Sequence, residues 1–132
     1  MTIRLAARAD LDAIASLLGP STWKPADFLA HNCRVAVVDE RVAGFLVSRE
    51  VAPGEREILY LAVDPPYRRR GIARELLRDE LARSGRAWFL EVRESNVAAI
   101  KLYESAGFRH AGRRPQYYSA PLETAIVMRF FS

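Results

Sequence analysis

Apolar residues recur along this chain at two spacings, one typical of helices and the other of strands. Helical spacing begins after Asp10, which can cap a helix, and the pair Gly19-Pro20 ends it. Asn96 or Ser95 can cap the last helix in the same way. Together with a shorter candidate near the amino-terminal end, the pattern predicts helices at 11–18, 23–30, 72–83 and 97–106.

Short runs of β-branched and other apolar residues separate these helices and predict strands. The runs 34–38 and 42–48 flank a polar turn at 39–41, which indicates a hairpin. The run 57–63 is apolar almost throughout, as in a strand that is covered on both faces. Further strands are predicted at 3–5, 87–92, 109–112 and 124–131, the last two as an antiparallel pair.

The order of these elements predicts the fold class. The strand 57–63, the helix 72–83 and the strand 87–92 form a βαβ unit, whose two strands run parallel. The hairpins before and after this unit are antiparallel. The sequence therefore predicts an α/β protein with a mixed sheet, in one domain that spans residues 1–132, because no repeat, linker or low-complexity tract divides the chain.

Composition narrows the setting of the protein. The formal net charge of +4, from 20 basic and 16 acidic residues, is compatible with an anionic small molecule, an acidic protein surface or RNA as partner. The single cysteine, Cys33, excludes an internal disulfide framework. No secretion leader and no apolar run of roughly 18 residues is visible, so we expect a cytoplasmic protein that does not enter a membrane.

The segment 63–73, called the arginine loop below, combines two prolines, three arginines and Gly71 between a predicted strand and a predicted helix. A P-loop would need a following Gly-Lys-Ser/Thr, and a dinucleotide fingerprint would need more spaced glycines, so both are excluded. A solvated basic turn is the ordinary alternative. The position before a helix favours a phosphate site, where backbone N–H groups and the helix dipole attract an anion.

Glu91 interrupts a strand that is otherwise apolar, and an unpaired buried carboxylate is costly. One interpretation is structural: Glu91 marks the wet end of the strand or pairs with Arg93. The functional interpretation is a general base that is activated by partial desolvation.

Tyr103 lies about two helical turns beyond Asn96, on the same face of the predicted helix. As a structural residue it would be a core aromatic with a satisfied hydroxyl. As a functional residue, its phenol could act as an acid toward a leaving thiolate.

Other candidates carry less chemistry. Cys33 is interpreted as a buried thiol near the start of a strand rather than a nucleophile. His31 and His110 are too few and too scattered for a metal site, and no metal is expected. A basic and aromatic patch could stack on RNA or line a substrate groove; its members are Arg109, Arg113, Arg114, Tyr117 and Tyr118.

Taken together, these residues resemble the GNAT superfamily of acetyl-CoA-dependent N-acetyltransferases, and within it the RimI-type ribosomal-protein-alanine N-acetyltransferases. The resemblance is strongest from about residue 59 to residue 108. The motifs that carry it are Leu61-Ala62-Val63-Asp64-Pro65, Arg68-Arg69-Arg70-Gly71-Ile72-Ala73-Arg74, Leu90-Glu91-Val92-Arg93-Glu94-Ser95-Asn96-Val97-Ala98-Ala99-Ile100 and Leu102-Tyr103-Glu104-Ser105-Ala106-Gly107-Phe108. It implies a GNAT-like, mostly antiparallel central sheet with a splayed parallel strand pair and about four helices on both faces.

The resemblance also implies the roles of the site residues. Glu91 would accept the proton of the acceptor amine, directly or through water, and Tyr103 would protonate the departing CoA thiolate. The acetyl donor would be acetyl-CoA, with no metal. The backbone of one strand would bind the pantetheine arm, the arginine loop and the start of the next helix would hold the pyrophosphate, and Asn96 would contact the cofactor: these residues are Leu61, Ala62 and Val63, then Arg69, Arg70, Gly71, Ile72, Ala73 and Arg74, then Asn96.

The acceptor is left open. RimI-type enzymes usually show Arg-Arg-Asn-Tyr-Tyr where this chain reads Arg113-Arg114-Pro115-Gln116-Tyr117-Tyr118, and Thr124 replaces an expected acidic residue. The leading hypothesis is acetylation of a protein N-terminal amine, as in a ribosomal protein. A small-molecule amine, a lysine side chain, a CoA-sensing domain without catalysis and an RNA-binding module are the alternatives, although no direct contact with nucleic acid is expected.

Overall fold

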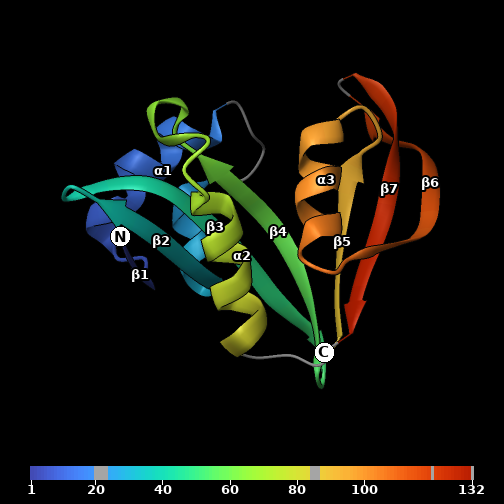
Figure 1. Cartoon of the computed structure of the whole chain (residues 1–132), viewed down its shortest axis with the longest axis horizontal. Helices are drawn as coiled ribbons and strands as arrows, with labels where there is room; N and C mark the ends of the chain where they lie inside the picture. The colour runs from blue at the N-terminus through green and yellow to red at the C-terminus, as the bar shows by residue number, and fades with distance from the viewer. Residues whose placement is uncertain (20–23, 84–86, 120, 132) are drawn as a thin grey trace. The chain divides into compact units, whose positions relative to one another are not determined.

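The computed structural model describes residues 1–19, 24–83, 87–119 and 121–131 (Figure 1). The chain forms two compact units, one of Met1–Arg49 with Ile58–Arg83 and the other of Glu50–Glu57 with Ser84–Ser132. Its strands belong to one seven-stranded sheet in the order β1-β2-β3-β4-β5-β7-β6. Within the described ranges, none of the helices has the length and apolar character that a membrane crossing requires.

The elements follow the predicted order. The strands are β1 (Thr2–Leu5), β2 (Asn32–Val38), β3 (Arg41–Ala52), β4 (Glu55–Val63), β5 (Ala87–Arg93), β6 (Arg109–Ser119) and β7 (Leu122–Phe131). The α-helices are α1 (Leu11–Leu18), α2 (Ile72–Arg83) and α3 (Val97–Ser105), and the 3-10 helices are η1 (Arg8–Asp10), η2 (Pro25–Ala30) and η3 (Pro65–Tyr67). The sheet is antiparallel except between β4 and β5, where the parallel register joins Glu55–Glu57 to Ala87–Phe89. The predicted α/β class with a mixed, mostly antiparallel sheet is confirmed.

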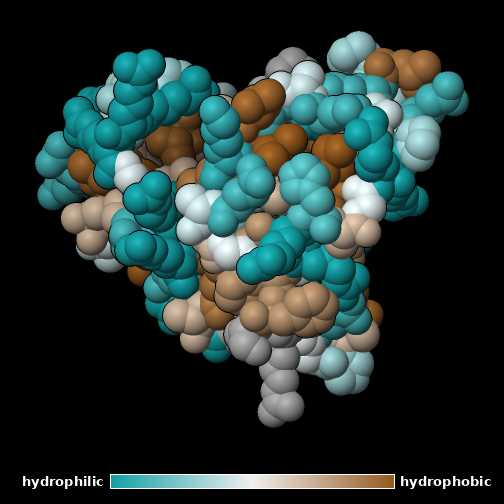
Figure 2. Space-filling view, turned by 45° about the vertical axis from the view of Figure 1, so that its right-hand side comes forward, coloured by the Kyte–Doolittle hydropathy of each residue, from teal (hydrophilic) through white to brown (hydrophobic). Residues whose placement is uncertain are grey.

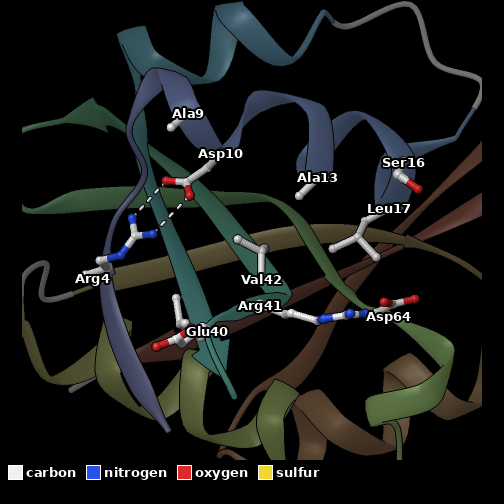
Figure 3. A pocket seen from close by; sticks show the side chains of 11 residues that line it. Arg4, Ala9, Asp10, Ala13, Ser16, Leu17, Glu40, Arg41, Val42 and Asp64 are labelled. Atoms are coloured by element: carbon white, nitrogen blue, oxygen red, sulfur yellow. Dashed lines mark hydrogen bonds and ion pairs between the residues drawn. The ribbon is translucent and has the colours of Figure 1, made fainter.

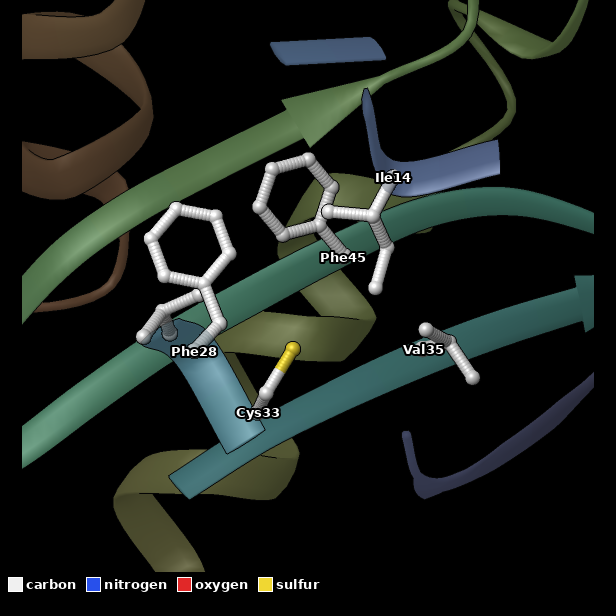
Figure 4. Close-up of a cluster of buried hydrophobic side chains, with 6 residues drawn as sticks. Ile14, Phe28, Cys33, Val35 and Phe45 are labelled. Atoms are coloured by element: carbon white, nitrogen blue, oxygen red, sulfur yellow. The ribbon is translucent and has the colours of Figure 1, made fainter. Parts of the chain in front are cut away.

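The core of the first unit follows from strand alternation. One face of β2 and β3 presents Cys33, Val35, Phe45 and Val47 to Ile14 of α1 and Phe28 of η2, and all six side chains are buried (Figure 4). Phe28 stacks on Phe45 with ring centroids 5.9 Å apart. Because successive residues of a strand point to opposite faces, the alternate positions of β2 and β3 face α2 instead.

Glu80 is the polar exception on the buried face of α2. Its side chain is fully buried; Oε1 accepts hydrogen bonds from Ser48 Oγ at 2.8 Å and from Asn32 Nδ2 at 2.5 Å. Nε of Arg34 lies 3.8 Å from the other oxygen. Removing one partner of such a buried charge typically costs about 3–5 kcal/mol, so this carboxylate fixes α2 to β2 and β3.

The second unit is built on β5, β7 and β6, with α3 packed against β7. Phe108 packs between α3 and β7: the centroid of its ring lies 5.8 Å from that of Tyr103 on α3 and 5.5 Å from that of Phe130 on β7. Gly107 between them has φ +105 and would bring a Cβ within 3.0 Å of the Phe130 ring, so a glycine is required there on both counts. The predicted helix end followed by an apolar contact is confirmed.

Several predicted boundaries are corrected. Residues 25–30 form a 3-10 helix rather than an α-helix, which suits a segment of six residues that begins with a proline; Trp23 and Pro20 lie outside the described residues. Asp10 occupies the N-cap position of α1 but makes no capping bond there, because its carboxylate binds Arg4 and the Ala7 N–H. The final hairpin extends well beyond the predicted 109–112.

Candidate active site

The arginine loop begins where β4 ends and turns through η3. The Tyr67 N–H donates to the Asp64 carbonyl at 2.8 Å, and the Arg68 N–H donates to the Pro65 carbonyl at 3.2 Å. Two residues have left-handed backbone, Arg69 at φ 65 and Gly71 at φ 76. Nothing lies within 4 Å of a Cβ built on Gly71, so glycine is favoured here by its backbone conformation and not by crowding.

The three arginine side chains of this loop are exposed, and no described carboxylate binds them. Nε of Arg68 donates to the Val63 carbonyl at 3.3 Å, and the guanidinium of Arg70 lies 5.4 Å from the centroid of the Tyr67 ring. Among the residues that the structure describes, Arg69 and Arg70 form no ion pair. Their positive charge is therefore available to an anion from solvent.

The start of α2 supplies further donors. The Glu75 N–H donates to the Gly71 carbonyl at 3.0 Å, which makes Gly71 the N-cap residue. The N–H groups of Ile72, Ala73 and Arg74 then precede the first intrahelical bond and have no partner within the helix. Free N–H groups, the helix dipole and neighbouring arginines together suit a pyrophosphate. The predicted phosphate-binding residues lie on this one short stretch.

The preceding strand approaches β3 closely. The Asp64 N–H donates to the Ala43 carbonyl at 2.8 Å, and a Cβ on Gly44 would lie 2.8 Å from the Ala62 carbonyl oxygen. The residues Leu61–Val63 lie beyond the part of β4 that pairs with β5, which involves Glu55–Glu57. Backbone groups without a strand partner are what an extended amide-containing arm such as pantetheine requires.

Glu91 lies on β5 with its carboxylate bound by an arginine of β6. Nη1 of Arg114 donates to both Oε1 and Oε2 of Glu91 at 3.0 Å. The side chain of Arg114 is 55% exposed and that of Glu91 is 12% exposed. Arg93, the partner that the structural interpretation predicted, binds Glu123 at 3.3 Å and the Pro121 carbonyl at 2.9 Å. Glu91 is thus a mostly buried carboxylate whose two oxygens are both bound by the half-exposed Arg114.

Tyr103 is buried on α3, where burial raises the pKa of its phenol to about 12. Tyr118 on β6 adds to this shift. The pKa of Tyr118 is also raised to about 12, by its own burial and then by the charge of Glu91. Both phenols therefore remain protonated at neutral pH, as a proton donor must. The same observations fit the structural interpretation of Tyr103 as a core aromatic.

Two other predicted residues have clear structural roles. The side chain of Asn96 caps α3, with Oδ1 accepting from the Ala99 N–H at 3.2 Å, as one of the two predicted caps. Its contact with a cofactor remains a prediction. Cys33 is 3% exposed, and burial raises the pKa of its thiol to about 12, so its interpretation as a buried thiol is confirmed. The described residues hold no group of three or more His, Cys, Asp or Glu side chains that could bind a metal.

A cavity of about 420 Å³ in the first unit does not resemble a phosphate site (Figure 3). The Arg4–Asp10 ion pair forms one wall, with Nη1 of Arg4 2.8 Å from the carboxylate, and Arg41 extends toward Asp64 on the other side. Its lining carries charges of both signs, whereas the three consecutive arginines of the arginine loop, Arg68–Arg70, carry only positive charge.

Sequence reasoning missed two features of the site. It placed Arg114 in a general basic patch and did not connect it to Glu91, because that contact depends on the register of three strands. It also did not identify Tyr118 as a half-buried phenol influenced by Glu91. The signal in the sequence was that residues 113–118 differ from the Arg-Arg-Asn-Tyr-Tyr pattern of RimI-type enzymes. The structure shows what this segment does: β6 bulges between Arg114 and Tyr118, with Gln116 at φ 55.

Comparison with the sequences of known proteins identifies several relatives of this chain. Over 148 residues the chain is 40% identical to N-alpha-acetyltransferase RimI of Mycobacterium tuberculosis, which covers 98% of this chain and 91% of that protein. It is 45% identical over 97 residues to the ribosomal protein bS18-alanine N-acetyltransferase of Salmonella typhimurium, covering 68% and 64%. The chain spans 38% of another relative, the uncharacterized protein ML0378 of Mycobacterium leprae, at 40% identity.

The chain is also similar in fold to solved structures. The ribosomal-protein-S18-alanine N-acetyltransferase from Escherichia coli has a TM-score of 0.85 at 33% identity, over 98% of this chain and 92% of that one. Ard1 from Thermoplasma volcanium has a TM-score of 0.88 at 28% identity, over 98% and 96%. The family model described as "Acetyltransferase (GNAT) family" matches residues 9–108, which include the arginine loop, Glu91 and Tyr103. This chain belongs to the GNAT acetyltransferase family.

Proposed function

We propose that this chain is an acetyl-CoA-dependent N-acetyltransferase that acts on the N-terminal α-amine of a protein, with a ribosomal protein as acceptor. The observation that carries this proposal is the 40% identity to a named N-alpha-acetyltransferase over 98% of the chain. Arg69 and Arg70 of the arginine loop, which form no ion pair with any residue that the structure describes, support an anionic donor such as acetyl-CoA. We also propose that the two units act as one domain and that the protein is cytoplasmic.

In the proposed reaction, acetyl transfer is direct. The neutral amine nitrogen attacks the thioester carbonyl carbon, so a C–N bond forms while the C–S bond breaks. Glu91 accepts the proton that the amine loses, directly or through one water, and Tyr103 gives its phenolic proton to the leaving thiolate. The products are an acetylated amine and CoA. Since no acyl-enzyme forms, Cys33 has no role, in agreement with its burial.

The cofactor would be held mainly through backbone and guanidinium groups. Arg69, Arg70 and the free N–H groups of 72–74 would bind the pyrophosphate, since an anion at a helix N-terminus is stabilised by both hydrogen bonds and the dipole. The backbone of 61–63 would bind the pantetheine arm.

A peptide panel tests this function. Purified protein with acetyl-CoA is offered a peptide with a free N-terminal alanine, a blocked peptide with an internal lysine, a small amine and no acceptor, and products are identified by mass spectrometry. We expect turnover of the alanine peptide and a loss of kcat of about 10²-fold or more in Glu91→Gln, the magnitude typical of a general base.

The matched control is Glu94→Gln, which removes a carboxylate three positions along the chain that is also paired with an arginine. It is expected to retain activity. Turnover of lysines or small amines without turnover of the alanine peptide would reject the N-terminal acceptor. CoA binding without any product would identify a sensing domain, and salt-dependent RNA binding without acetylation would favour the RNA-binding module.

A further inference from the structure

The carboxylate of the proposed base is already neutralised by a cation of its own chain. Arg114 donates through one nitrogen to both oxygens of Glu91 at 3.0 Å, while its guanidinium lies 4.4 Å from the centroid of the Tyr117 ring. Glu91 is 12% exposed and Arg114 is 55% exposed, so a molecule that approaches from solvent meets the arginine more readily than the carboxylate. The pair therefore attracts an incoming cation much less than Glu91 alone would.

The neighbouring charges do not restore that attraction. Two further carboxylates of this region, Glu94 and Glu123, each have an arginine partner: Arg113 binds Glu94 at 2.9 Å, and Arg93 binds Glu123 at 3.3 Å. Tyr118, whose phenol is influenced by the charge of Glu91, is neutral at physiological pH. The surroundings of Glu91 thus present about as much positive as negative charge to an acceptor.

We infer that Arg114 makes this enzyme select N-terminal α-amines over lysine ε-amines, because it cancels the charge with which Glu91 would attract an ammonium group. The inference rests on the proposed function of Glu91 as the base. Arg114 acts through Glu91 and is a positioning residue rather than a catalytic one.

The selection follows from the basicity of the two amines. Near pH 7.5 about a quarter of α-amines are neutral, whereas only about one lysine in a thousand is, from reference pKa values near 8 and 10.4. A neutral amine can approach Glu91 without repulsion from Arg114, but a lysine ammonium must displace it or lose its proton in solution first. Without Arg114, the uncompensated carboxylate would bind the ammonium and bring its proton within reach.

The experiment compares two acceptor peptides of the same sequence context. One has a free N-terminal alanine and no lysine, and the other has a blocked N-terminus and one internal lysine. Steady-state kcat and KM are measured for both with the wild-type chain, Arg114→Gln, Arg114→Lys and Arg113→Gln. The last variant is the matched control, since it removes the same charge from the adjacent residue and breaks the equivalent pair with Glu94.

We expect Arg114→Gln to lower the ratio of kcat/KM for the α-amine over the lysine about tenfold, through a lower KM for the lysine peptide, as one unit of charge beside the base would. Arg114→Lys, which keeps the charge, should restore most of the ratio, and Arg113→Gln should leave it unchanged.

Two results would overturn the inference while the proposed function stands. One is a ratio that is the same in Arg114→Gln and the wild type. The other is an equal loss of kcat on both peptides, which would mean that Arg114 only holds the Glu91 side chain in place. A wild-type chain that acetylates the lysine peptide but not the α-amine would overturn both this inference and the proposed function.

Discussion

Arginines of this chain occur in two kinds of surroundings, and the contrast separates binding of an anion from control of a base. In the arginine loop, Arg69 and Arg70 have no carboxylate partner in the part of the chain that the structure describes. The opposite holds for Arg93 of β5 and for Arg113 and Arg114 of β6, each of which lies in an ion pair. An unpaired guanidinium can bind a phosphate, whereas a paired one adjusts the carboxylate that it contacts.

The first prediction concerns Tyr103, the proposed proton donor in the unit that holds the paired arginines, and it has the largest expected effect of those in this section. Tyr103→Phe removes the phenolic proton but keeps the ring that packs on Phe108, so the fold should persist. We expect kcat to fall about 10²-fold, a loss typical of removing a general acid. The KM values for acetyl-CoA and for the acceptor peptide should change little. Thermal melting serves as the control, and a melting temperature close to that of the wild type is required for the result to count.

The pH dependence sharpens the same prediction. The pKa of Tyr103 is raised to about 12, so the phenol stays almost fully protonated up to about pH 10. The wild-type rate should therefore show no alkaline decline that depends on Tyr103 up to about pH 10. A decline near pH 9 that disappears in Tyr103→Phe would contradict this assignment of the proton donor.

A smaller effect, on the KM for acetyl-CoA, is expected from substitution of an arginine in the arginine loop. Arg69→Gln removes one cation that would contact the pyrophosphate and breaks no ion pair among the described residues. The KM for acetyl-CoA should rise about tenfold while kcat at saturation stays the same, because a charge-assisted hydrogen bond contributes about 1.5–3 kcal/mol and this one is exposed. Arg109→Gln, on the exposed strand β6, is the control of equal charge. Equal changes in both variants would indicate a nonspecific effect of net charge.

The smallest effect concerns backbone conformation. Gly71→Ala adds a methyl group that meets nothing within 4 Å but places an alanine at φ 76, which costs about 1 kcal/mol. We expect unfolding in urea to shift by about that amount, and the KM for acetyl-CoA to rise a few-fold. Gly112→Ala is the matched control, because that glycine also has open space around it and lacks a positive φ. Its stability should not fall, and a loss as large as that of Gly71→Ala would show that backbone strain is not the cause.

Most of the fold could be predicted because local patterns specify it. The helix 72–83 was predicted with its observed bounds, since its apolar spacing is regular and a glycine precedes it. Glu80 could be placed on the buried face by the same spacing, but its partners Asn32 and Ser48 are far away in the sequence. Only the packing of α2 on two strands reveals why a carboxylate is tolerated there.

The final hairpin shows where local patterns fail. The strand β6 continues to Ser119, although the sequence predicted an end at residue 112. Its second half is polar and contains Pro115, both of which argue against a strand. A bulge accommodates the proline and Gln116 and lets pairing resume at Tyr118 opposite Glu123. The same bulge follows Arg114 directly, so the contact with Glu91 could not be predicted from either segment alone.

Large apolar side chains that reach solvent are scattered over several elements, and Figure 2 shows hydrophobic areas separated by hydrophilic ones on the visible face. Scattered apolar residues of this kind are normal on protein surfaces.

The burial of Cys33 has a practical consequence. The chain contains one cysteine, which is 3% exposed, and the pKa of its thiol is raised to about 12. Toward maleimides and other thiol reagents, the folded protein therefore behaves as if it had no cysteine. A cysteine introduced at an exposed position, such as Val97→Cys on the first turn of α3, would carry a fluorophore or spin label there alone, without prior replacement of the native residue.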